Sequence, residues 1–141
     1  MAQTSNELVV LRPNNAVGNP APARLPPHNL DAEQALLAAI LGNNMAHEKV
    51  SEFLRAEHFY NPVFGKMYSA AVTLIERGQK ADAITLKHFF ASDPEITQLG
   101  GDDYLAQLTG SYVSIINAGD YGRTIHDLYL RRMLIGVGTD I

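Results

Sequence analysis

The sequence contains no cysteine among its 141 residues, and this absence excludes several kinds of chemistry. Disulfide bonds, thiol nucleophiles and zinc or iron–sulfur sites with cysteine ligands cannot form in this chain. A reducing compartment is compatible with the absence but is not proven by it. The N-terminus also lacks the basic and then apolar pattern of a secretory signal, so we expect a cytoplasmic protein.

Long apolar runs and an excess of basic residues are also missing. No apolar run approaches the roughly 20 residues that are needed to cross a bilayer. The chain has 11 Lys and Arg against 15 Asp and Glu, which gives a net charge of −4. This balance argues against a protein that binds nucleic acid mainly through bulk electrostatics, because phosphate binding needs clustered Lys and Arg. A hydrophobic content of 46% predicts a globular chain with a real core.

Catalytic motifs are absent from the sequence as well. Gly65 and Lys66 are followed by Met67, and no upstream glycine completes a phosphate-binding loop. His47 lacks a second histidine four positions on, where Ser51 stands, so the pair of ligands typical of a zinc protease is not present. The five histidines do not cluster in the sequence. We therefore predict no catalytic, cofactor-binding or metal-binding residue in this chain.

The clearest structural signal is a capped helix within residues 26–42. Two prolines stop any helix from arriving from upstream, and Asn29 can accept hydrogen bonds from the first free N–H groups. Asp31 and Glu33 place negative charge in the first turn, where the helix dipole favours it. Gly42 is predicted to end the helix in a left-handed conformation. The apolar stripe of this helix is Leu36, Leu37, Ile40 and Leu41.

The rest of the chain reads as further helices joined by turns. We expect them near residues 45–54, 62–77, 82–91, 94–99, 102–109 and 117–141. Met45, Val50, Phe53 and Leu54 are predicted to pack in the second helix, and Ile84, Leu86, Phe89 and Phe90 in the fourth. No segment shows the sustained alternation of a strand, so the predicted fold class is all-α.

Three regions are predicted along the chain. Residues 1–24 form a proline-rich disordered tail, residues 25–101 a compact head of about five helices, and residues 102–141 a helical hairpin. The apolar residues of the hairpin exceed what one packed side needs, which favours a protein–protein interface over an intrachain core face, although both remain open. The substitutions Ile125→Asp and Leu128→Asp are then expected to weaken the association between copies of the chain. The candidate interface residues are Leu105, Leu108, Ile115, Ile116, Tyr121, Ile125, Leu128 and Tyr129.

Six short segments carry a resemblance to a known family. They are residues 25–37, 58–62, 68–78, 82–86, 100–105 and 121–132, in this order and at plausible spacing. Together they resemble the N-terminal domain of the bacterial replicative DNA helicase, the DnaB family. The resemblance covers about residues 25–141, and residues 1–24 match nothing firmly in that family.

The resemblance implies a collar domain that assembles a larger motor. In this family the hairpins pair between subunits, and six chains form a ring arranged as a trimer of dimers. The collar recruits the helicase-binding C-terminal domain of primase and takes part in loading by a partner loader. It sits on RecA-like ATPase domains, which use ATP and Mg and pull single-stranded DNA, in the bacterial cytoplasm at the nucleoid.

The linker and ATPase domain of that family have no counterpart in this sequence. We therefore expect a fragment of a longer parent, which is an ATP-dependent helicase, and we expect the fragment alone to be inactive and to need no cofactor. The alternative is a stand-alone helical adaptor or regulator that has a helicase-like head and no motor.

Overall fold

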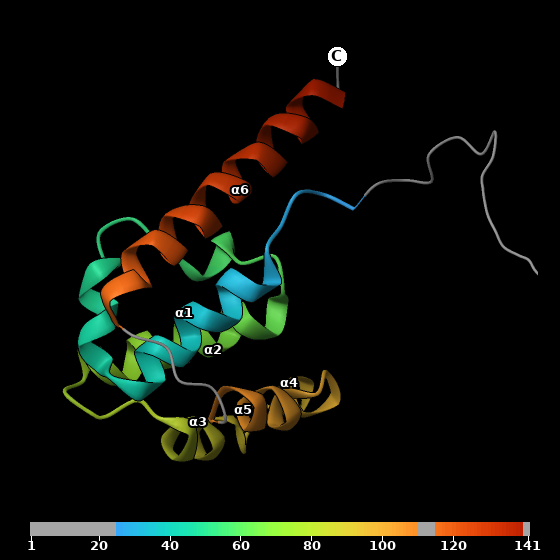
Figure 1. Cartoon of the computed structure of the whole chain (residues 1–141). Helices are drawn as coiled ribbons and strands as arrows, with labels where there is room; N and C mark the ends of the chain where they lie inside the picture. Colours follow the sequence, from blue (N-terminus) through green and yellow to red (C-terminus); the bar gives the residue numbers. More distant parts are fainter. Residues whose placement is uncertain (1–24, 110–114, 140–141) are drawn as a thin grey trace, which may run out of the picture.

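The computed structural model describes residues 25–109 and 115–139, in which all regular structure is helical. Six α-helices and three short 3-10 helices follow one another, and Figure 1 shows their arrangement. They are α1 (Leu30–Gly42), η1 (Asn44–Lys49), η2 (Ala56–His58), α2 (Pro62–Glu76), α3 (Ala83–Phe90), α4 (Pro94–Gln98), α5 (Gly101–Thr109), η3 (Ile115–Asn117) and α6 (Ala118–Thr139). The all-α prediction is confirmed. The predicted tail, residues 1–24, lies outside the described residues.

Helix α1 forms the centre of the fold. Its N-cap is Asn29, as predicted, and the side-chain oxygen of Asn29 accepts a hydrogen bond from the backbone N–H of Ala32 at 3.0 Å. Every side chain from residue 36 to residue 41 is buried, so the helix is covered on all sides rather than along one stripe. Helices α2, α5 and α6 and the turn η1 all pack on it.

The C-terminal end of α1 differs from the prediction. Gly42 is the last helical residue, and Asn43 continues the chain in an extended conformation with φ of −154°. The left-handed glycines of the described residues are instead Gly78 and Gly100, which follow α2 and α4. Asn43 can leave the helix without a left-handed turn because its side chain caps η1 by accepting from the N–H of Met45.

The helix predicted over residues 45–54 is wrong. The structure has the 3-10 helix η1 followed by a turn, and Met45 is 61% exposed, although Val50 and Leu54 are buried as expected. The physical cause is Asn44. Its side-chain nitrogen donates to the carbonyl oxygens of Ile40 and Ala81, and its side-chain oxygen accepts from the N–H of Ala81 at 2.9 Å. This long-range bridge holds the chain in a tight turn.

Helices α2 and α3 begin where the sequence predicts. The Asn61 side chain accepts from two backbone N–H groups at the start of α2, and Pro62 follows it. At α3, Asp82 and Thr85 satisfy each other's backbone N–H groups in a capping box. The starts of these helices are determined by neighbouring residues, so the sequence is sufficient to predict them.

The packing predicted for Ile84 is wrong, because this side chain is 80% exposed. Leu86 and Phe90 lie one turn apart on α3 and are both buried. A helix of eight residues turns only one narrow face inward. Ile84 lies off that face and Phe89 lies at its edge, with 39% of its surface exposed.

Helices α5 and α6 lie on different sides of α1 (Figure 1). Helix α5 packs on α1, α3 and α4, whereas α6 packs on α1, η1 and η2. The predicted turn between them falls in residues 110–114, which lie outside the described residues. In the described part of the expected hairpin, α5 therefore joins the head, and α6 alone protrudes from it. None of the helices described here is long and apolar enough to span a bilayer.

Candidate functional site

The first half of α6 is fixed against the head. Ala118, Gly122 and Ile125 are all buried, and Ile125 is only 1% exposed. A Cβ atom at Gly122 would collide with the side chain of Val50 and lie 3.3 Å from the Phe53 ring. Glycine at this position therefore allows α6 to lie directly on the turn that follows η1.

Further along α6, Arg132 also contacts the head. Its Nη1 atom donates to the backbone oxygen of Pro27, and its Nη2 atom donates to the backbone oxygen of His58, each at 2.8 Å. The guanidinium carbon also lies 5.4 Å from the centre of the Tyr60 ring and 5.8 Å from that of Tyr129, in cation–π contact. One side chain thus ties α6 to two separate segments of the head.

A buried carboxylate lies beneath this contact. Glu33 is 1% exposed, and its two oxygens accept from the backbone N–H groups of Tyr60 at 2.8 Å and Asn61 at 3.2 Å. Burial raises the pKa of Glu33 above 4.5, while these two hydrogen bonds and the charge of Arg132 act in the opposite direction. Glu33 therefore orders the segment against which Arg132 packs.

Two histidines face each other where η2 meets α6. The rings of His58 and His126 meet edge to face with their centres 4.8 Å apart. The Nδ1 atom of His58 accepts from the backbone N–H of Arg55 at 2.9 Å, which requires an unprotonated Nδ1. Burial, and next the neighbouring His126, lower the pKa of His58 below 6.5. The contact is therefore built for a neutral His58.

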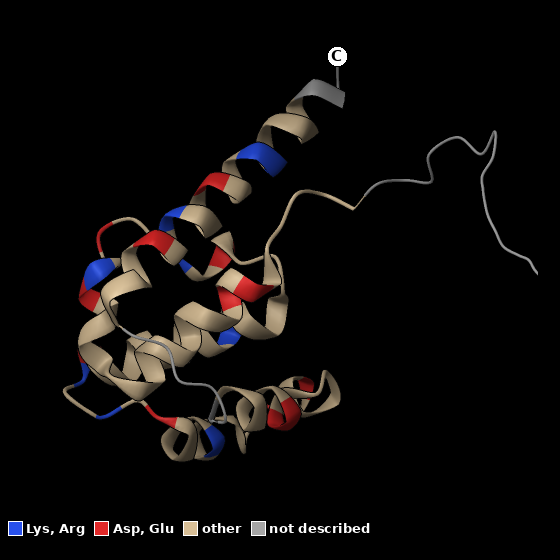
Figure 2. Ribbon diagram, viewed as in Figure 1, with Lys and Arg blue, Asp and Glu red and all other residues tan. Residues whose placement is uncertain are grey.

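The outer half of α6 is exposed and apolar. Leu130, Met133, Leu134 and Val137 follow the spacing i, i+3, i+4, i+7 and so lie on one face of the helix; we call them the outer stripe. These four side chains are between 45% and 70% exposed, and none belongs to the hydrophobic core. From Met133 to Thr139 the sequence carries no charge, and in Figure 2 the coloured part of α6 beyond its last basic residue is tan. An exposed stripe of this kind is typical of a helix that packs against a partner.

The candidate interface residues predicted from sequence fall into three groups. Leu105, Leu108 and Ile125 are buried in the core of the same chain. Ile115 and Tyr121 pack half-buried against that core, and Leu128 and Tyr129 are half-buried on α6. Only Ile116, at 80%, is largely exposed. The structure therefore does not bring the eight residues together on one open surface.

Sequence reasoning missed the outer stripe. The helical spacing of Leu130, Met133, Leu134 and Val137 was readable in the sequence, and it continues the helix predicted from residue 117. What the sequence did not reveal is the point along α6 at which the head stops covering it, because that depends on the packing of α1, η1 and η2.

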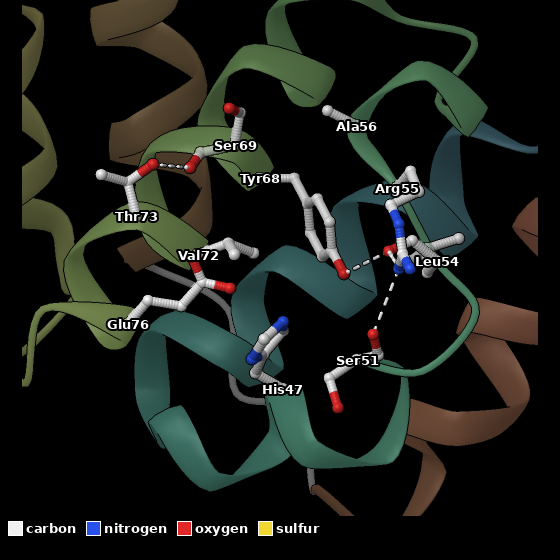
Figure 3. Close-up of a pocket in the computed structure, with 10 residues that line it drawn as sticks. All are labelled: His47, Ser51, Leu54, Arg55, Ala56, Tyr68, Ser69, Val72, Thr73 and Glu76. Atoms are coloured by element: carbon white, nitrogen blue, oxygen red, sulfur yellow. Dashed lines mark hydrogen bonds between the residues drawn. The ribbon is translucent and has the colours of Figure 1, made fainter.

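A polar pocket of about 390 Å³ between η1 and α2 is the competing candidate site (Figure 3). Tyr68 donates its hydroxyl to the backbone oxygen of Leu54 at 3.0 Å, and Arg55 donates to the backbone oxygens of Ser51 and Leu54. Burial raises the pKa of Tyr68 to about 12, which keeps the hydroxyl protonated as a donor. These polar groups therefore hold the backbone around the pocket.

The remaining polar groups of this pocket do not form a catalytic arrangement. Among the described residues no hydrogen bond joins His47 to Ser51 or to Glu76, so there is no nucleophile and base pair. Burial lowers the pKa of His47. The described residues also hold no group of three side chains that could bind a metal ion.

Comparison with known proteins connects this fold to one family. Residues 25–127 match the family model of the DnaB-like helicase N-terminal domain. The chain belongs to this family. The sequence is 43% identical over 119 residues to the replicative DNA helicase DnaB of Rickettsia bellii, and 35% identical over 114 residues to that of Treponema pallidum.

A solved structure of the same family has the same fold. The N-terminal domain of the DnaB helicase from Mycobacterium tuberculosis aligns with a TM-score of 0.76 and 34% sequence identity, covering 82% of this chain and 84% of that one. The two curated relatives are much longer than this chain. The matches cover 84% and 81% of the chain, but only 24% and 26% of the relatives. The resemblance read from the sequence is confirmed for the N-terminal domain.

Proposed function

We propose that this chain is the assembly domain of a replicative DNA helicase and that the outer stripe of α6 forms the contact between copies. The observation that carries the proposal is the exposure of Leu130, Met133, Leu134 and Val137 on one face of a protruding helix. Apolar residues at this spacing pack well against the same pattern on a second helix. Because a symmetric pair uses one patch twice, a single stripe on each copy is sufficient.

The attachment of α6 to the head supports this proposal. Arg132 donates two hydrogen bonds to the head, and Gly122 allows close packing at the other end of the attached segment. The outer stripe is therefore held in one orientation before a partner arrives. Fixing the geometry beforehand lowers the entropy lost on association.

Membership of the family extends the proposal beyond this chain. Six copies of the parent form a ring as a trimer of dimers, and the collar docks the C-terminal domain of primase and takes part in loading by a loader protein. The alternative is a stand-alone adaptor without a motor. Sequencing past Ile141 tests it, because a reading frame that continues into a phosphate-binding loop would eliminate the alternative.

The motor activity is assigned to the remainder of the parent. The 141 residues contain no phosphate-binding loop, so ATP, Mg and the pulling of DNA belong to a further domain. We expect the isolated chain to release no phosphate from ATP above a blank in a coupled assay, with the full-length parent as the positive control. Measurable turnover by the chain alone would contradict this assignment.

Self-association is tested by comparing two aspartate variants. Leu134→Asp places a charge in the proposed contact, whereas Met45→Asp makes the same change at a site that is 61% exposed on the head. We expect the wild type and Met45→Asp to associate alike in sedimentation velocity, and Leu134→Asp to associate at least about tenfold more weakly, because an unpaired charge is costly in an apolar contact. Equal association of the three proteins would disprove the proposed contact.

Primase docking is tested in the same instrument. The C-terminal domain of primase is added to the wild-type chain, and we expect a faster-sedimenting complex that contains both proteins. Independent sedimentation of the two proteins at every concentration would remove primase docking from the proposal while leaving self-association in place.

A further inference from the structure

A second surface lies on the head, in a groove between the end of α2 and α3. It encloses about 560 Å³. In Figure 1, α3 lies at the end of the molecule away from the protruding half of α6. The assembly contact proposed above does not include any of the residues that line the groove. These residues are Leu74, Arg77, Gln79, Lys80, Ile84, Thr85, His88 and Phe89.

The groove is lined by one buried apolar side chain and by two exposed ones. Leu74 is 7% exposed and belongs to the core, whereas Ile84 is 80% and Phe89 39% exposed. Helix α3 is already anchored by Leu86 and Phe90, which are both buried. Ile84 therefore contributes little to holding α3 in place, and the exposed parts of Ile84 and Phe89 are costly to leave in water.

The rim of the groove is basic. Arg77, Lys80 and His88 line it, and no acidic residue does. In the described part of the chain no ion pair involves Arg77 or Lys80. This arrangement stands out in a chain whose net charge is −4.

The nearest acidic residues along the chain, Glu76 and Asp82, do not line the groove. Glu76 precedes Arg77 in the sequence but lines the polar pocket next to η1. The Asp82 carboxylate accepts from the N–H of Thr85 as the N-cap of α3. Among the described residues neither carboxylate forms an ion pair with Arg77 or Lys80, so the groove offers cations next to an apolar surface.

We propose that this groove binds an acidic segment of a partner protein. A large apolar side chain of the segment sits between Ile84 and Phe89, and flanking carboxylates pair with Arg77 and Lys80. A peptide fits better than a nucleic acid, because phosphate binding needs more clustered cations than this rim provides, while an apolar anchor gains from leaving water. Charge complementarity at the rim then selects acidic partners.

The peptide used to test this proposal is obtained by selection from a random library. Random dodecapeptides are displayed and selected on the immobilised chain, and the consensus peptide is synthesised with a fluorescent label for anisotropy. We expect enrichment of a large apolar residue flanked by Asp or Glu. Anisotropy is read at protein concentrations where sedimentation shows a single species, so a failure here is separate from a failure of assembly through α6.

Two variants and two matched controls identify the groove. Lys80→Glu and Ile84→Asp are each expected to lower the affinity for the consensus peptide at least about tenfold. The first reverses a charge at the rim, and the second removes an apolar contact for the peptide. Lys49→Glu and Met45→Asp make the same changes at exposed positions outside the groove and should leave the affinity unchanged. All four positions are exposed, so far-UV circular dichroism should be identical across the set.

Three outcomes would overturn the proposal. The first is a selection that yields no binder or a consensus without acidic residues. The second is a peptide whose affinity survives both Lys80→Glu and Ile84→Asp. The third is competition by single-stranded oligothymidylate that is weakened by Lys80→Glu but not by Ile84→Asp, which would make the rim a nucleic-acid surface.

Discussion

The two halves of α6 have similar apolar side chains and opposite surroundings. Along residues 118–129 these side chains are buried or half-buried against the head, whereas along residues 130–137 the outer stripe is exposed. Arg132 lies near the change and donates two hydrogen bonds to the head. Apolar content alone therefore does not distinguish a core face from an interface. The distinction depends on whether another part of the same chain covers the face.

The largest expected effect is a difference in stability between one substitution in each half of α6. Ile125→Asp buries a charge without a partner and should lower the free energy of unfolding by about 3–5 kcal/mol. Leu134→Asp, in the exposed half, should change it by less than about 0.5 kcal/mol at concentrations where both proteins are monomeric. Urea unfolding followed by circular dichroism measures both. A stable Ile125→Asp protein that only fails to associate would restore the interpretation made from sequence, in which Ile125 belongs to the interface.

A smaller effect is expected where the two halves meet. Arg132→Met keeps much of the side-chain volume but leaves the carbonyl oxygens of Pro27 and His58 without their donors. We expect the free energy of unfolding to fall by about 2 kcal/mol, because each hydrogen bond comes from a charged donor but the site is only half-buried. The control is Arg131→Met at the exposed neighbouring position, which should be nearly neutral. Equal losses in the two variants would show that Arg132 does not fasten α6.

The smallest effect is a dependence of stability on pH. The pKa of His58 is lowered in the folded state, so the unfolded state binds the proton more readily, and His58 reduces stability as pH falls below 6.5. Glu33 acts with the opposite sign. Its pKa is raised in the folded state, so the folded state binds the proton more readily and Glu33 adds stability as pH falls towards 4.5. His47, whose pKa is also lowered, acts in the same direction as His58.

His58→Asn isolates the contribution of this one histidine. The asparagine oxygen can still accept from the N–H of Arg55, while the titrating ring is lost. We expect the variant to lose less stability than the wild type between pH 7 and pH 5.5, by no more than about 1.4 kcal/mol per pH unit. Parallel stability profiles for the two proteins would mean that His58 does not titrate in this range.

The parts of the fold that were predicted correctly depend on local chemistry. Asn29, Asn61, Asp82 and Asp93 each accept from backbone N–H groups at the start of the helix they precede, so neighbouring residues decide where those helices begin. The segment after α1 was predicted wrongly because Asn44 bonds to Ala81, which is 37 positions away. The spacing of apolar residues along the sequence does not indicate a contact over this distance.

The candidate site shows the same division. The spacing of Leu130, Met133 and Leu134 was readable, but their exposure follows from where the head ends. Leu105 and Leu108 have the same helical spacing and are buried because α5 packs on α1 and α3. Local pattern predicts which residues share a face, and only the tertiary fold decides whether that face is already covered.

Sedimentation velocity of the wild type and Leu134→Asp over a range of concentrations tests the central claim most directly. The account predicts that the wild type moves from monomer to dimer or larger species as concentration rises. Leu134→Asp should remain monomeric at the same concentrations, with an unchanged circular dichroism spectrum and with the wild-type unfolding midpoint at concentrations low enough for both proteins to be monomeric. A wild type that stays monomeric throughout, or a variant that associates as the wild type does, would contradict the assignment of the outer stripe to assembly.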